Sequence, residues 1–159
     1  MKVTLTLMEQ RLAKALARWR QDTQRENGVT DRRVSEKHEV DIDLEGAGAE
    51  LALARVLNVY PDLDNTPSEE DLVTRDGRRV DVKATRYSSG RLLAVPWKRG
   101  HPADVYVLMV GKFPTYRIAG WIPREELFQD ANLQDFGSGK VKGYALPQEK
   151  LRPIGSLQE

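Results

Sequence analysis

Asp71, Asp81 and Lys83 are the residues of this 159-residue chain whose types and spacing point most directly to chemistry. Mg²⁺ in proteins is held by one or two carboxylates, keeps several waters and binds a substrate phosphate. A lysine beside such an ion can orient or deprotonate a metal-bound water, or stabilise a pentacovalent phosphate. The three residues therefore fit phosphodiester hydrolysis. Acyl and glycosyl transfer fit less well, because no nucleophile with a partner base can be picked out.

The relative position of the two aspartates depends on the hairpin expected around Asp76–Gly77. A two-residue turn would place Asp71 and Asp81 on opposite faces. A three-residue loop that ends at a left-handed Gly77 instead places Leu72 across from Val80 and Asp71 across from Asp81. We prefer the second register because it alone sorts the apolar side chains onto one face. It predicts two carboxylates within a few ångströms of each other.

A third carboxylate, Glu50, lies on a helix that we expect from about Leu44 to Asn58. The residues that share its helical face are mainly small or apolar: Asp43, Gly46, Ala47, Leu53, Ala54 and Leu57. Burial of a carboxylate in such a stripe is costly unless the group is paired or bound to a metal. The alternative is a rotated helix on which Glu50 reaches water. Glu45 is the weaker candidate for the same role.

The order of these residues resembles the PD-(D/E)XK nuclease superfamily. Asp71 is followed after nine residues by Asp81-Val82-Lys83, and Glu50 precedes them on a helix. The similarity spans roughly residues 44–122. The resemblance implies a mixed central sheet flanked by helices, that is, a restriction-endonuclease-like fold. One departure is Glu70, which stands before Asp71 where the family name expects proline.

The same resemblance implies a role for each site residue. Carried over residue by residue, Glu50, Asp71 and Asp81 bind the metal together with the Val82 backbone carbonyl, and Lys83 is the catalytic lysine. The expected cofactor is Mg²⁺, with Mn²⁺ able to substitute. The implied function is a metal-dependent DNA endonuclease. The alternatives are a Holliday-junction resolvase of the same superfamily and a catalytically inactive DNA-binding module. We expect DNA as the partner, and a homodimer, because cutting both strands takes two sites.

The charge along the chain favours a phosphate partner. Residues 75–101 carry eight Lys and Arg against two acids, whereas residues 36–70 carry ten acids against two basic residues. This suits a protein that holds cations in one place and phosphates next to it, although two ordinary solvated faces would show the same pattern. The residues expected to contact DNA are Arg86, Tyr87, Arg91, Lys98, Arg99 and His101. Trp121 is expected in the core rather than as a stacking platform for bases.

The elements that must position these residues fit one α/β domain with a mixed central sheet of about five strands flanked by helices. We expect an N-terminal helix over 6–20 and a polar linker within 1–40, a catalytic core over 41–131, and a C-terminal loop and docking segment over 132–159. The expected strands cover 72–75, 79–85, 92–95, 103–110 and 116–122, and a short helix covers 124–131.

Composition excludes several other classes of site. The absence of cysteine removes disulfides and thiolate metal sites, and two distant histidines disfavour a zinc centre. Any metal here would be a hard cation on carboxylate oxygens. No apolar run approaches the roughly 20 residues that span a bilayer, and the N-terminus is a poor signal peptide. The expected location is therefore the cytoplasm.

Overall fold

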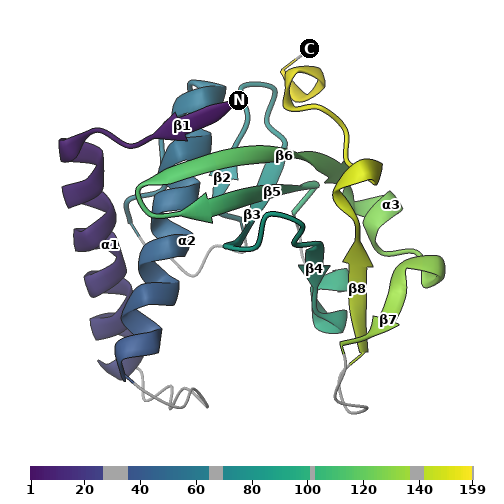
Figure 1. Cartoon of the computed structure of the whole chain (residues 1–159), viewed down its shortest axis with the longest axis horizontal. Helices are drawn as coiled ribbons and strands as arrows, with labels where there is room; N and C mark the ends of the chain where they lie inside the picture. The colour runs from purple at the N-terminus through teal and green to yellow at the C-terminus, as the bar shows by residue number, and fades with distance from the viewer. Residues whose placement is uncertain (27–35, 65–69, 101–102, 137–141, 159) are drawn as a thin grey trace.

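The computed structural model describes residues 1–26, 36–64, 70–100, 103–136 and 142–158. It confirms the expected fold class: a five-stranded mixed sheet carries helices on one face (Figure 1). The strand order is β1-β6-β5-β3-β2. The strands are β1 (Lys2–Thr4), β2 (Leu72–Val73), β3 (Arg79–Thr85), β5 (Val105–Lys112) and β6 (Thr115–Pro123). Only β3 and β5 pair in parallel; the other neighbours are antiparallel.

Two long helices, α1 (Leu7–Glu26) and α2 (Glu36–Leu57), lie side by side on that face. The polar linker expected after residue 20 was wrong at both ends, because α1 continues to Glu26 and α2 begins at Glu36; its middle, 27–35, lies outside the described residues. Most residues of 21–26 are polar or charged types that tolerate an exposed helix, and the Thr23 hydroxyl bonds back to the Trp19 carbonyl at 2.9 Å. The polar residues of 21–26 therefore belong to the solvated end of α1 and not to a loop.

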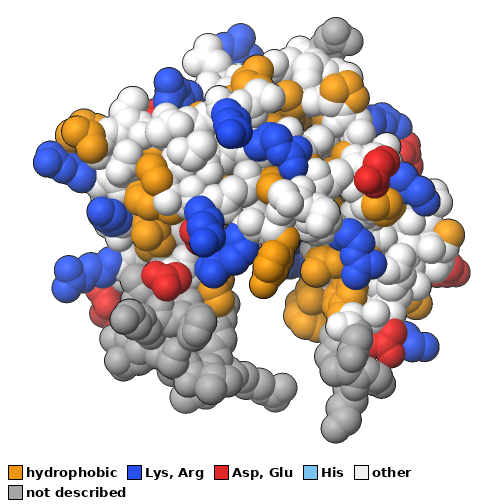
Figure 2. Space-filling view, viewed as in Figure 1, with side chains coloured by type: hydrophobic (Ala, Val, Ile, Leu, Met, Phe, Trp, Pro, Cys, Tyr) orange, Lys and Arg blue, Asp and Glu red, His pale blue; other side chains and the backbone are white. Residues whose placement is uncertain are grey.

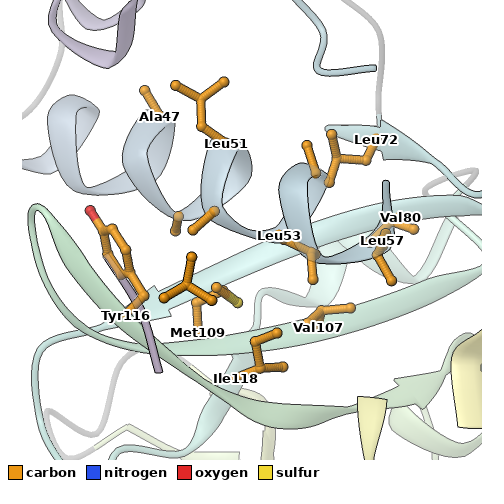
Figure 3. Close-up of a cluster of buried hydrophobic side chains, with 14 of the residues drawn as sticks. Ala47, Leu51, Leu53, Leu57, Leu72, Val80, Val107, Met109, Tyr116 and Ile118 are labelled. Carbon is orange, nitrogen blue, oxygen red and sulfur yellow. The ribbon is translucent and has the colours of Figure 1, made fainter. Parts of the chain in front are cut away.

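The apolar stripe of α2 packs on the sheet and forms the first core (Figure 3). Leu53 and Leu57 of α2 meet Val80 of β3 and Val107 of β5 in this cluster. Alternate residues of β5 point to the other face and join a second core with α3 (Arg124–Leu127) and β8. Strand β5 is therefore buried on both faces, as its nearly continuous apolar sequence indicates.

A second sheet, with the order β4-β8-β7, covers this other face. Its strands are β4 (Leu92–Ala94), β7 (Leu133–Asp135) and β8 (Lys142–Leu146). Two expectations were wrong here. The strand expected at 92–95 lies outside the central sheet, and the fifth strand of that sheet is β1. Residues 132–159 contain strands, whereas only a loop and a docking segment were expected. Gly143, a residue type common in loops, is buried in β8, where the Phe136 ring leaves no room for a side chain.

The remaining elements are short. The helix expected over 124–131 is α3 followed by a 3₁₀ turn, η2 (Asp130–Asn132). Three further 3₁₀ turns are η1 (Pro96–Gly100), η3 (Gln148–Lys150) and η4 (Ile154–Leu157). Across the described ranges, none of the helices is both long and apolar enough to cross a membrane.

The β2–β3 hairpin has the preferred register. Leu72 pairs with Val80, the Thr74 N–H donates to the Arg78 carbonyl at 2.9 Å, and Gly77 is left-handed with φ +86°. Val80 and Val82 consequently pack against the first core. Asp81 and Lys83 alternate with these valines, so they point to the opposite face of the sheet.

Candidate functional site

The site is built where β2 ends and β3 continues. Asp71 immediately precedes β2, and its N–H donates to the Val80 carbonyl at 2.8 Å. Its carboxylate Oδ2 accepts the Val82 N–H at 2.6 Å. Since β2 has only two residues, this carboxylate takes the place of a strand partner for Val82. The carbonyl of Val82 lies on the same edge, because the N–H and C=O of one strand residue point the same way.

Asp81 is the most deeply buried acid of the described chain, with 3% of its side chain exposed. Two ammonium groups compensate this charge. Lys83 contacts Oδ1, and Lys98 of η1 lies with its Nζ 3.1 Å from Oδ2. A buried carboxylate needs such partners to offset the loss of hydration. Burial and the Asp81 charge together raise the pKa of Tyr106, the β5 residue that pairs with Asp81.

Glu50 reaches the site from α2 and is held by Arg20 of α1. The guanidinium Nη1 and Nη2 atoms lie 3.0 and 2.7 Å from the two carboxylate oxygens, a bidentate pair. Both side chains are mostly buried, with 12% of Glu50 and 18% of Arg20 exposed. The expected cost of burying Glu50 is thus offset by an ion pair. Sequence reasoning missed Arg20, although its spacing from Ala13 and Leu16 places it on the buried face of α1.

The second glutamate of α2, Glu45, serves the fold elsewhere. Its Oε2 accepts the backbone N–H of Phe113 at 2.9 Å and the Tyr116 hydroxyl at 3.2 Å. These bonds tie α2 to the turn between β5 and β6. Of the two candidates, Glu50 is therefore the one that faces the aspartates.

Charge repulsion shows that three acids lie within electrostatic reach of one another. Burial, followed by the charges of Glu50 and Asp81, raises the pKa of Asp71 to about 7. The Val82 N–H and Lys83 oppose this shift. Burial also raises the pKa of Glu50, against the effect of Arg20. We call Glu50, Asp71, Asp81 and Lys83 the edge site, since Asp71 lies at the edge of β3 beyond β2, and the charges of Glu50 and Asp81 both act on it.

The edge site matches the predicted ligand set only in part. In the described ranges no three acidic or histidine side chains are close enough together to hold one metal ion. Arg20 engages both oxygens of Glu50, which removes it from direct coordination in this arrangement. Both oxygens of Asp81 are engaged too, by Lys83 and Lys98, so in this arrangement Asp71 is the acid with a shortage of neutralising charge. If Lys83 moved away from Asp81, Asp71 and Asp81 would offer hard oxygen donors suited to a magnesium ion that keeps several of its waters.

The residues predicted to contact DNA fall into two groups. Arg86, Tyr87, Arg91 and Arg99 have exposed side chains, and Arg99 also donates to the Tyr144 hydroxyl at 3.2 Å. Lys98 is turned inward to Asp81, a role that its loop position did not suggest.

Two further sequence expectations concern His101 and Trp121. His101 lies outside the described residues. Trp121 is buried, as expected, and its indole N–H lies 3.0 Å from the Ser156 hydroxyl and 3.2 Å from the Pro153 carbonyl.

The chain belongs to a family of unknown function, DUF5843, whose model matches residues 1–117. The matched segment contains the whole edge site together with Arg20 and Lys98, and it ends inside β6. A search of curated proteins finds no match to the chain.

Proposed function

We propose that this protein is a metal-dependent deoxyribonuclease that hydrolyses phosphodiester bonds at the edge site. The observation that carries the proposal is the position of Asp71. Its carboxylate accepts the N–H of Val82, the residue between Asp81 and Lys83, and the Asp81 carboxylate in turn contacts Lys83. Two acids and a lysine around one strand edge are the groups that metal-assisted phosphoryl chemistry requires. The resemblance to PD-(D/E)XK nucleases supports the same function.

Asp71 and Asp81 are the residues that would hold Mg²⁺, and the Val82 carbonyl lies beside them. Bound there, the ion would neutralise phosphate charge and acidify a coordinated water. Asp81 Oδ1 would become available when Lys83 leaves it, and Glu50 could join only after its carboxylate leaves Arg20. A divalent cation beside Asp71 would counter both causes of its raised pKa, the burial of its charge and the repulsion from Glu50 and Asp81.

Lys83 is the residue that would act on the substrate. Its Nζ rests on Asp81 Oδ1, and 27% of the side chain is exposed, so it can meet a phosphate arriving from solvent. There the ammonium would neutralise charge that develops on the phosphate oxygens. Lys98 would keep Asp81 paired while Lys83 turns to the substrate.

The test is a cleavage assay with supercoiled, linear, single-stranded and four-way-junction DNA, in Mg²⁺ or in excess chelator. Wild type should cut at least one substrate, only with the metal. Asp81→Asn should abolish cutting, whereas Asp22→Asn, which removes an exposed carboxylate of α1, should not. Full activity in chelator, or an active Asp81→Asn variant, would contradict the proposal. Cutting of the four-way junction alone would identify the resolvase alternative.

One observation favours a second candidate, a DNA-binding module without catalysis. Glu50 is neutralised by Arg20, and Asp81 by Lys83 and Lys98, so these two acids are balanced without a metal. This candidate predicts DNA binding without cleavage on every substrate. The predicted homodimer is tested separately by light scattering with and without DNA.

A further inference from the structure

A hollow lies beside Lys83, on the face of the sheet turned away from α2. Its volume is about 270 Å³, and the residues that define its chemistry are Lys83, Thr85, Tyr87, Arg91, Leu93 and Leu108. We call it the aromatic pocket. Lys83 belongs both to its wall and to the edge site, so a molecule bound in the pocket lies next to the proposed reaction centre.

The side chains of the aromatic pocket define what it can bind. Tyr87 is 72% exposed, so its ring is largely unused in the packing of the protein, and Leu93 adds further exposed apolar surface. Lys83 and Arg91 contribute two cations. A ring face, an apolar wall and positive charge suit a flat, stackable group that carries a negative charge. A nucleobase with its phosphate has this chemistry.

The segment that carries Tyr87 is firmly held. Within the turn, the Gly90 N–H donates to the Tyr87 carbonyl at 2.9 Å. The Gln148 side-chain amide donates to the Ser88 and Gly90 carbonyls at 2.9 and 2.8 Å. A Cβ on Gly90 would lie 2.5 Å from the Thr85 hydroxyl oxygen, so the turn packs closely on β3. Because the backbone that carries Tyr87 is held in this way, a ligand on its ring need order only the side chain.

The wider surface also suits a negatively charged strand. On the face seen in Figure 2, several Lys and Arg side chains lie near the centre, with hydrophobic side chains beside them. Beside the pocket, Arg91 is fixed by a contact with the Gln134 side chain of β7. A basic surface with aromatic groups is the usual design of proteins that bind single strands.

We infer that the aromatic pocket binds one unpaired nucleotide of a DNA strand, with its base against Tyr87 and its phosphate toward Lys83. This inference rests on the proposed function for its choice of DNA. In a duplex the faces of the bases are stacked and cannot reach a side-chain ring without unstacking. The substrate class is therefore DNA with a single-stranded part, rather than a continuous duplex.

The experiment measures binding by fluorescence anisotropy in excess chelator, so that no cleavage occurs. The probes are a thymidine oligonucleotide, an abasic oligonucleotide of equal length and a blunt duplex. Wild type should bind the thymidine strand most tightly. Tyr87→Ala should weaken that binding about tenfold, the size of one base-stacking contact, and should hardly affect the abasic strand. Tyr87→Phe should bind like wild type.

The matched control is Tyr60→Ala, because Tyr60 is 80% exposed but lies in a hollow lined by acids. It should leave binding unchanged. A preference of wild type for the duplex, or an equal effect of Tyr87→Ala on the thymidine and abasic strands, would overturn the inference. If stacking is found but no DNA is cut with Mg²⁺, the proposed function fails and the pocket stands. If DNA is cut but Tyr87→Ala binds normally, the inference about the pocket fails and the proposed function stands.

Discussion

Two hollows adjoin the edge site, and each has an exposed tyrosine in its wall. Tyr60 lines a hollow of about 490 Å³ together with Asp62, Asp64, Glu70 and Asp71, which we call the acidic hollow. Tyr87 lines the smaller aromatic pocket beside Lys83. Asp81 links the two, because its charge acts on Asp71 and its carboxylate contacts Lys83. The charged neighbours of the two rings favour different ligands: carboxylates attract cations and repel DNA, and ammonium groups do the reverse.

The largest expected effect concerns Lys83, which belongs to the pocket and touches Asp81. Lys83→Ala should reduce cleavage about 10² to 10⁴-fold, the usual contribution of a group that acts on protons or charge in the transition state. The fold should persist because Lys98 still pairs with Asp81. The measurements are plasmid cleavage and thermal unfolding, with Arg86→Ala, an exposed basic residue of the same segment, as the control.

Val82, the residue next to Lys83, should affect stability rather than cleavage. Val82→Asp should destabilise the protein by about several kcal/mol, because it places a charge in the core beneath α2. A tolerated Val82→Asp together with an unfolded Lys83→Ala would show that the two faces of β3 have been assigned the wrong way round.

The second prediction tests the acidic hollow through pH. The pKa of Asp71 is raised to about 7, so the folded state favours the protonated acid. The stability from this proton is present below about pH 4, the ordinary pKa of aspartate, and is lost as the pH rises through 7. Asp71→Asn keeps an acceptor for the Val82 N–H but has no such titration. From pH 4 to pH 8, the free energy of unfolding of the variant should rise relative to that of wild type by on the order of 1 to 3 kcal/mol.

The free energy of unfolding in denaturant, measured for both proteins at the two pH values, checks this prediction. Other groups titrate in both proteins, so the difference between wild type and variant isolates Asp71. A constant difference across the two pH values would mean that Asp71 keeps an ordinary pKa, and that burial and the charges of Glu50 and Asp81 act on it less than described.

The third prediction asks whether the acidic hollow and Asp81 together attract a cation. At pH 8, Mg²⁺ at about 100 times its dissociation constant should stabilise wild type by about 2.7 kcal/mol if one ion binds only the folded state. Asp71→Asn should lose most of this gain, whereas Tyr87→Ala should keep it. Thermal unfolding with and without Mg²⁺ measures the effect. Equal stabilisation of the Asp71 variant and wild type would place the cation elsewhere.

The smallest expected effect tests the difference in charge between the acidic hollow and the aromatic pocket. Asp64 is an exposed acid of the acidic hollow, and Asp64→Asn removes one charge that repels a DNA strand. At low salt the affinity for the thymidine oligonucleotide should rise about twofold, and the gain should fade as salt screens the charge. Anisotropy titrations at two salt concentrations check it. A loss of affinity would show that the acidic hollow itself contacts the strand.

The local parts of the site could be predicted from the sequence because short-range rules determine them. The hairpin register followed from the need to place Leu72, Val80 and Val82 on one face, and this placed Asp71 and Asp81 around one strand edge. The position of Glu50 on a largely buried stripe of α2 followed from helical spacing.

The partners of these acids could not be predicted because they come from distant segments. Arg20 meets Glu50 across thirty positions, and Lys98 meets Asp81 across seventeen. Likewise, β4 has the pattern of a central strand, but its partner is β8, which the chain supplies some fifty residues later. Local periodicity identifies a strand and its buried face; it does not identify the neighbour.

The hydrogen bonds from Gln148 to the Tyr87–Gly90 turn also bear on the order in which the molecule can be assembled. During synthesis, the α2 glutamate, the hairpin aspartates and both lysines leave the ribosome well before residue 148. Contacts between near residues cost little loop entropy, whereas those between distant ones must await the rest of the chain. The acids can therefore gather early, while the ring that would hold a base is secured only when the end of the chain has folded.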